Sequence, residues 1–131
     1  MARIDLHERP TGLSGPALDY NIEVTVAAGG QATIDGPQVN PGRTARLIGL
    51  IVSSSIILKT EVRTVEAGIA SLTRITRFSL EHGWDWKSPD PNLITVAYTG
   101  LGLDAFRLIL TNMDTGLAGD VYATIIYDEV P

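Results

Sequence analysis

The residues of this 131-residue chain that could do chemistry gather in one polar segment, 81–92, with the sequence Glu-His-Gly-Trp-Asp-Trp-Lys-Ser-Pro-Asp-Pro-Asn. His82, Asp85 and Ser88 are the one local set from which a Ser-His-Asp arrangement could be built, because that chemistry needs a histidine held beside its nucleophile. The other histidine, His7, lies in an irregular N-terminal stretch. Such groupings in loops are common by chance, so we expect no catalytic residue and no enzyme.

Carboxylates offer two further kinds of site. Asp85 and Asp90 could flank a glycosidic bond, although spacing alone does not establish such a pair. Together with Asp114 and Asp120 they could supply loop oxygens to calcium, but Asp-Pro and Asp-Thr-Gly are ordinary turn sequences. Zinc or iron would need closely spaced histidines or thiolates, and this chain has two distant histidines and no cysteine. We therefore predict no metal and no cofactor.

Trp84 and Trp86 are the most distinctive pair in the segment. On an extended chain, side chains at i and i+2 point the same way, so the two rings could form a stacking platform for a sugar, with Asp85 and Asp90 beside them. Alternatively, the rings cap the open end of a sandwich or pack on a neighbouring subunit, because large aromatic side chains are more often buried than displayed. We favour packing and keep a carbohydrate-binding or receptor-binding, lectin-like module as the alternative.

The segments that must position these residues are short β-strands. From about Ile22 to Asp128, apolar residues alternate with polar ones, and Gly, Pro, Asn and Asp turns separate the runs. Eight strands are predicted, at 22–26, 31–35, 44–53, 56–65, 69–80, 93–99, 104–111 and 119–128. The sequence thus predicts an all-β fold, a single antiparallel β-sandwich of about eight strands. Eight is the strand count of a jelly roll, although counting alone leaves an immunoglobulin-like topology open.

Two parts of the chain have more apolar surface than one small sandwich needs. Residues 1–21 are predicted to be an extended N-terminal arm preceding the domain at 22–131; the arm has no period, yet it contains Leu6, Leu13 and Leu18. The last strand is partly apolar on both faces, with Tyr122 and Ile126 on the side opposite Val121 and Ile125. We predict that the five residues Leu6, Leu13, Leu18, Tyr122 and Ile126 contact other subunits in a homo-oligomer.

Composition limits the possible partners. The formal net charge is −5 and the pI is near 4.8, so we predict no nucleic-acid partner, which would need a basic face. No apolar run is long enough to span a bilayer and the N-terminus lacks the apolar core of a secretory signal, so we predict a protein made in the host cytoplasm with no membrane contact.

The second half of the chain resembles a known group of proteins. Residues 106–116, Phe-Arg-Leu-Ile-Leu-Thr-Asn-Met-Asp-Thr-Gly, and 118–127, Ala-Gly-Asp-Val-Tyr-Ala-Thr-Ile-Ile-Tyr, are similar to the closing hairpin of small β-sandwich phage structural proteins of the decoration, cement or minor capsid type. Residues 44–54 are similar in character. Hydrophobic alternation with Asn, Asp and Gly turns carries this resemblance, and unrelated sandwiches share it.

The resemblance implies a symmetric assembly, with a trimer favoured, on an icosahedral shell. Its partners would be the major capsid protein or another virion protein, and its location would be the virion. The group has no catalytic residues to transfer. The leading hypothesis from the sequence is therefore a non-enzymatic virion structural protein that binds capsid subunits and its own copies through apolar surface.

Overall fold

The computed structural model describes residues 17–79 and 83–131, which form ten β-strands and no helix. In chain order the strands are β1 (Leu18–Val26), β2 (Gln31–Asp35), β3 (Thr44–Ser54), β4 (Leu58–Glu66), β5 (Ile69–Ala70), β6 (Ile75–Ser79), β7 (Trp84–Lys87), β8 (Thr95–Ala97), β9 (Ala105–Asn112) and β10 (Gly119–Val130). None of the described residues lies in a helix that could cross a membrane.

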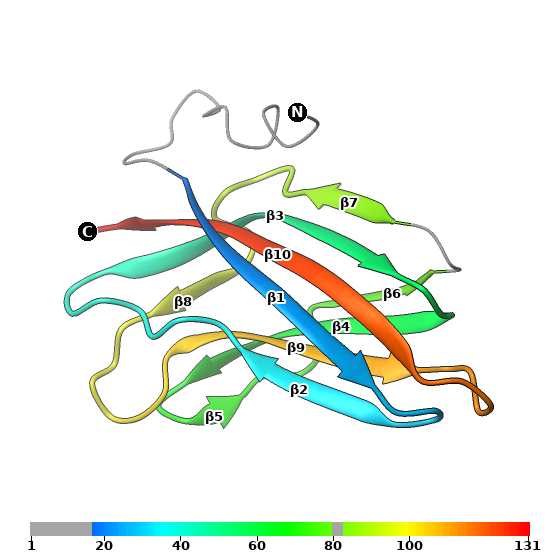
Figure 1. Cartoon of the computed structure of the whole chain (residues 1–131). Helices are drawn as coiled ribbons and strands as arrows, with labels where there is room; N and C mark the ends of the chain where they lie inside the picture. The colour runs from blue at the N-terminus through cyan, green and yellow to red at the C-terminus, as the bar shows by residue number, and fades with distance from the viewer. Residues whose placement is uncertain (1–16, 80–82) are drawn as a thin grey trace.

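The strands form two antiparallel sheets that face each other (Figure 1). Sheet A has the order β1-β10-β3-β7, with β8 also paired to β3, and sheet B has the order β2-β9-β4-β5, with β6 also paired to β4. Because β5 and β6 share one position beside β4, and β7 and β8 share one beside β3, the ten strands fill eight positions. Successive positions in the chain alternate between the two sheets through most of the fold, as in a jelly roll. The predicted jelly-roll-like sandwich is confirmed.

Three predicted boundaries were wrong. The strand predicted at 69–80 is two strands, β5 and β6, and β7 lies inside the segment 81–92, for which a loop is predicted. β1 begins at Leu18 instead of Ile22, so 18–21 belong to the sandwich rather than to the arm. The cause is pairing with β10: Leu18 is opposite Tyr127 and Asn21 is opposite Thr124, and these contacts are about a hundred residues distant in sequence.

The core fills the space between the sheets with every second side chain of the central strands. In sheet A, Leu50 and Val52 of β3 lie beside Ile125 and Ala123 of β10. In sheet B, β4 and β9 contribute Leu58, Val62, Leu108 and Leu110, and all four are buried. The alternate side chains of these strands lie on the outer faces of the two sheets.

A β-bulge changes that parity at one place. The register between β10 and β3 shifts between Ile126 and Tyr127, so that Ile126 is opposite Gly49 but Tyr127 is opposite Leu47, and Ile48 has no partner in the register. Ile48 and Ile126 then form a small second cluster against Ala17 and Ile51. Ile126 is 0% exposed. Ile126, which we predict to contact another subunit, is thus buried by the chain itself.

Asp104 ties the loops together at one end of the sandwich. Its buried carboxylate accepts hydrogen bonds from the N–H groups of Ala67 (2.8 Å) and Thr99 (2.9 Å), from the Thr99 hydroxyl (2.8 Å) and from the Gln38 amide (3.2 Å). Burial alone would raise the pKa of Asp104, but the donors from Ala67, Thr99 and Gly100 outweigh it and hold this pKa well below its usual range. Three separate loops thus meet at one carboxylate.

Candidate functional site

The two tryptophans are strand residues and they face inward. Trp84 is opposite Val52 and Trp86 is opposite Leu50 in the pairing of β7 with β3, and both partners are fully buried core residues. Both rings are partly buried and pack against the core. An outward platform on this strand would need the other parity, so the rings are not displayed on the outer face of sheet A.

Arg77 covers one of these rings. It lies on β6 opposite Thr60, whose side chain is fully buried, and its guanidinium carbon is 5.0 Å from the centre of the Trp84 ring. This contact joins the edges of the two sheets and is favourable because a cation is attracted to an aromatic face. Arg77 has no signal in the sequence, since nothing in the local pattern places β6 across from β7. The guanidinium occupies a position that a stacked sugar would need.

The edge between β6 and β7 also contains buried polar atoms without hydrogen-bond partners. Among the described residues these include Thr60 Oγ1, Ser79 Oγ and Trp84 Nε1. Ser79 and Arg77 are neighbours on the inward side of β6, in register with Leu58 and Thr60 of β4. Buried polar groups are usually paired, so this edge is a place where a bound water or a small polar ligand would gain hydrogen bonds.

The four carboxylates considered as candidates have separate surroundings. Asp85 is exposed on the outer face of sheet A, opposite Ile51, whereas Asp90 accepts the Asn92 N–H (2.8 Å) within its own turn. Asp114 accepts the N–H groups of Gly116 and Leu117, and Asp120 accepts the Thr25 hydroxyl. In the described ranges no group of three or more acidic or histidine side chains could hold a metal ion. Ser88 donates to the Asp90 carbonyl, while His7, His82, Leu6 and Leu13 lie outside the described residues.

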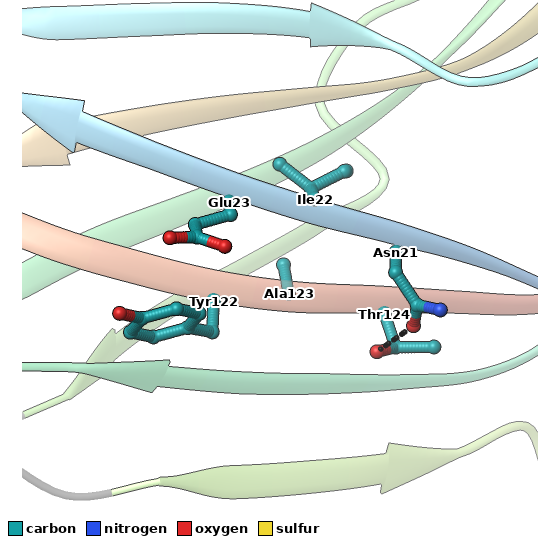
Figure 2. A pocket seen from close by; sticks show the side chains of 6 residues that line it. All are labelled: Asn21, Ile22, Glu23, Tyr122, Ala123 and Thr124. Atoms are coloured by element: carbon teal, nitrogen blue, oxygen red, sulfur yellow. Dashed lines mark hydrogen bonds between the residues drawn. The ribbon is translucent and has the colours of Figure 1, made fainter.

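A hollow of about 290 Å³ lies on the outer face of sheet A, between β1 and β10. Figure 2 shows Glu23 and Tyr122 at one end of it and Asn21 and Thr124 at the other. Each pair is in register across the two strands, and Thr124 donates a hydrogen bond of 2.8 Å to Asn21 Oδ1. Ile22 and Ala123 turn their side chains to the core, so the floor between the two pairs is open.

The face around the hollow is acidic. Glu23, Asp85 and Asp120 have the outward parity of their strands, and Lys87 has the same outward parity on β7. Arg46 adds no net charge, because it forms a buried pair with Asp128 at 2.7 Å. The hydrogen bond to Asp128 raises the pKa of Arg46. The described part of this face therefore has more acidic than basic side chains.

A second surface lies at the end of the sandwich where Asp104 joins the loops. Ile69 (75% exposed) begins β5, Leu72 (88% exposed) follows β5, and Tyr98 (37% exposed) and Leu101 (82% exposed) lie in the β8–β9 loop. The β4–β5 turn touches the β8–β9 loop there, since the Gly68 N–H donates to the Leu103 carbonyl at 2.9 Å (Figure 1). We call Ile69, Leu72, Tyr98 and Leu101 the apolar tip. Sequence analysis placed turns at these points but not the exposed side chains beside them.

Of the predicted subunit contacts in the described ranges, two remain accessible. Leu18 is exposed at the start of β1, and Tyr122 is 50% exposed at the hollow. They lie on neighbouring strands of sheet A, but Leu18 has the inward parity of β1 and Tyr122 the outward parity of β10.

Comparison with known proteins defines the class of fold. No protein-family description matches the sequence, and no curated protein is significantly similar to it. Among solved structures, a triple jelly-roll protein from the turret assembly of an archaeal virus is similar with a TM-score of 0.52 and 17% identity over 89% of this chain. This chain spans 29% of that protein.

A CBM4 structure is similar with a TM-score of 0.50 and 13% identity, covering 89% of this chain and 90% of that one. The expected likeness to viral β-sandwich proteins is thus confirmed at the level of the fold, and a carbohydrate-binding module shares it.

Proposed function

We propose that this protein is a non-enzymatic structural component of a virion, of the decoration, cement or minor capsid type. It would act by binding capsid subunits and further copies of itself. The jelly-roll fold, which a viral turret protein shares, supports this proposal. The observation that carries it is the apolar tip, because a rigid sandwich that displays large apolar side chains has surface suited to another protein.

Hydrogen bonds and a close backbone contact hold the loops at the apolar tip in one conformation. Asp104 holds the β4–β5 turn and the β8–β9 loop through the Ala67 N–H and the Thr99 N–H and hydroxyl, at 2.9 Å or less. Gly102 lies so close to Ala67 that a Cβ there would be 2.7 Å from the Ala67 carbonyl carbon. Ile69 and Leu101 flank this contact. A surface that is already ordered loses little conformational entropy on binding, so apolar area there contributes efficiently to affinity.

Leu18, Tyr122 and the N-terminal segment with Leu6 and Leu13 would supply a second contact, between copies. We propose a homo-oligomer, with a trimer favoured, that sits on the major capsid protein or another virion protein. Two separate contact surfaces are what a protein needs if it binds both a shell and its own copies.

Co-sedimentation with capsids tests the proposal. The double variant Leu72→Ser and Leu101→Ser should bind capsids at least about fivefold more weakly, as expected for loss of central apolar contacts, while its circular dichroism spectrum and thermal unfolding stay unchanged. Leu117→Ser is the matched control, because Leu117 is 64% exposed outside the tip, in the β9–β10 connection. If the double variant and the control bind capsids equally well, or if the parent protein ignores capsids, the proposal fails.

The alternative is a carbohydrate-binding or receptor-binding module that uses the edge at Trp84 and Trp86. The unpaired Trp84 Nε1, Thr60 Oγ1 and Ser79 Oγ atoms favour it, since a polyhydroxylated ligand could pair with them. Arg77 would have to move from the Trp84 ring. A glycan array with the parent and Trp84→Phe, which keeps a ring and removes the N–H donor, is the test. Glycan binding that the substitution abolishes would support this alternative, and a blank array would remove it.

A further inference from the structure

The hollow between β1 and β10 has hydrogen-bond acceptors and an aromatic ring that suit a cation. Glu23 has a carboxylate that no hydrogen bond or ion pair engages in the described part of the chain. Across the strand pair, Tyr122 presents half of its surface to solvent. A cation placed between them would meet a carboxylate and an aromatic face together, and both attract it.

The groups at the other end of the hollow suit a planar guanidinium, which has several N–H donors, better than a single ammonium group. Asn21 Oδ1 and Thr124 Oγ1 share one hydrogen bond, and both oxygens keep lone pairs that can accept more. Residues at i and i+2 on a strand are roughly 6.6 Å apart, so Glu23 and Asn21 are too widely spaced for one ammonium group to satisfy well. A guanidinium has five N–H donors in a rigid plane and can reach both ends.

The volume of the hollow and the charge around it also favour a single cationic side chain. About 290 Å³ is at the lower limit of ordinary ligand pockets, roughly 300 Å³, and suits one side chain better than an extended oligosaccharide. The acidic side chains Asp85 and Asp120 on the same face would raise the local concentration of a positively charged group. The hollow is open on the outer face, so a side chain from another molecule could enter it without rearrangement of the strands.

We propose that this hollow binds an arginine side chain presented by a protein partner, with the guanidinium against the Tyr122 ring and paired with Glu23. The identity of the partner as a virion protein rests on the proposed function, but the arginine site itself does not. Its occupant would be an exposed, basic segment of a neighbouring subunit.

The experiment is a titration of the isotope-labelled full chain with a blocked Gly-Arg-Gly tripeptide, followed by NMR. Chemical shifts of Asn21, Glu23, Tyr122 and Thr124 should move together and saturate, and added salt should weaken the binding. The same tripeptide with citrulline is the matched ligand control, because it keeps the shape and removes the charge. Methyl glucoside is the second ligand.

Two variants locate the site. Glu23→Gln and Tyr122→Leu should each weaken arginine binding by about two- to fivefold, the range for an exposed ion pair or an exposed cation–aromatic contact. Tyr122→Phe should leave it unchanged, since the ring is kept. Asp85→Asn removes a charge from the same face but outside the hollow, so it should have a smaller effect than Glu23→Gln.

Several results would overturn the proposal: equal binding of citrulline and arginine tripeptides, shifts outside the hollow only, or saturable binding of methyl glucoside with no response to arginine. The last result would assign the hollow to a sugar. Because the titration uses the isolated protein, it can succeed while capsid co-sedimentation fails, so the two ideas fail separately.

Discussion

Gly119, the first residue of β10, lies so close to Ile56 that a side chain at this position cannot be accommodated. A Cβ built there would overlap Cγ1 and Cγ2 of Ile56, which is buried, and would be 2.9 Å from its Cβ. The backbone of Gly119 does not have a positive φ, so a substitution there tests steric overlap alone. Gly119→Ala should therefore destabilise the protein through overpacking by about 1–3 kcal/mol.

The loss in the free energy of unfolding depends on how far the Ile56 side chain can move away from the new Cβ. Ile56 belongs to the main core cluster, where Val26 and Val121 are also buried, so a shift of the side chain passes the overlap to its neighbours. Rotation of Ile56 alone would place the cost near the lower end of the range, and a shift of the β10 backbone would place it near the upper end. Urea unfolding at several protein concentrations measures the free energy of unfolding and shows whether self-association contributes.

A double-mutant cycle separates this cause from others. Ile56→Ala alone should cost about 2–5 kcal/mol, as buried aliphatic truncations do, but in that background Gly119→Ala should cost clearly less than it does in the parent. Gly116→Ala is the control on the same β9–β10 connection, because its Cβ would meet only Asp114 Oδ1 at 3.5 Å; its effect should stay within about 0.5 kcal/mol. Additive costs for Gly119→Ala and Ile56→Ala would refute the steric explanation.

Three further predictions concern stability. Ala67 and Gly68 form a two-residue turn with φ values of 53° and 78°, a conformation that favours Asn-Gly. Ala67→Asn should therefore stabilise the protein by roughly 0.5–1 kcal/mol, as measured by thermal unfolding. A loss of stability would contradict this prediction. Because the folded-state pKa of Asp104 is lowered, the native state binds fewer protons than the unfolded state in acid; the stability that Asp104 contributes is complete above about pH 5 and is lost as pH falls below about 4. Urea midpoints measured against pH should fall less steeply in acid for Asp104→Asn than for the parent, and parallel curves would contradict this. Asp128→Ala leaves Arg46 buried without its partner and should cost about 3–5 kcal/mol, whereas Arg46→Met combined with Asp128→Leu should recover most of that loss.

The fold class could be predicted because strand periodicity is a local property. Alternation in the segments that became β1, β4 and β9 marks a buried and an exposed face for each strand, and Gly and Pro turns separate them. The count of eight positions and the all-β class follow from these two signals. The break between β5 and β6 has no clear signal because β5 is only two residues long, and β7 has none because it lies in a segment rich in polar and proline residues.

The candidate site could be predicted only in part. Tyr122 was predicted as a contact residue and is exposed at the hollow, but Asn21, Glu23 and Thr124 have no sequence signal beyond their parity. Trp84 and Trp86 were correctly seen to share one side of an extended strand, and the pairing of β7 with β3 decides that this side is the core. For the apolar tip, the turns at 67–68 and 100–102 were visible in the sequence, but their contact was not.

By itself, the sequence determined which residues alternate, where the chain turns and the sign of its charge, because these depend on neighbours a few positions away. The tertiary structure decided which face each strand buries, through pairings such as that of Ile22 with Ala123, a hundred residues later. It also decided that a bulge at Ile48 buries Ile126, and that β1 and β10 lie together and form a hollow between their outward side chains. A one-residue shift in register exchanges the two faces of a strand, and only contacts across the sheet fix that register.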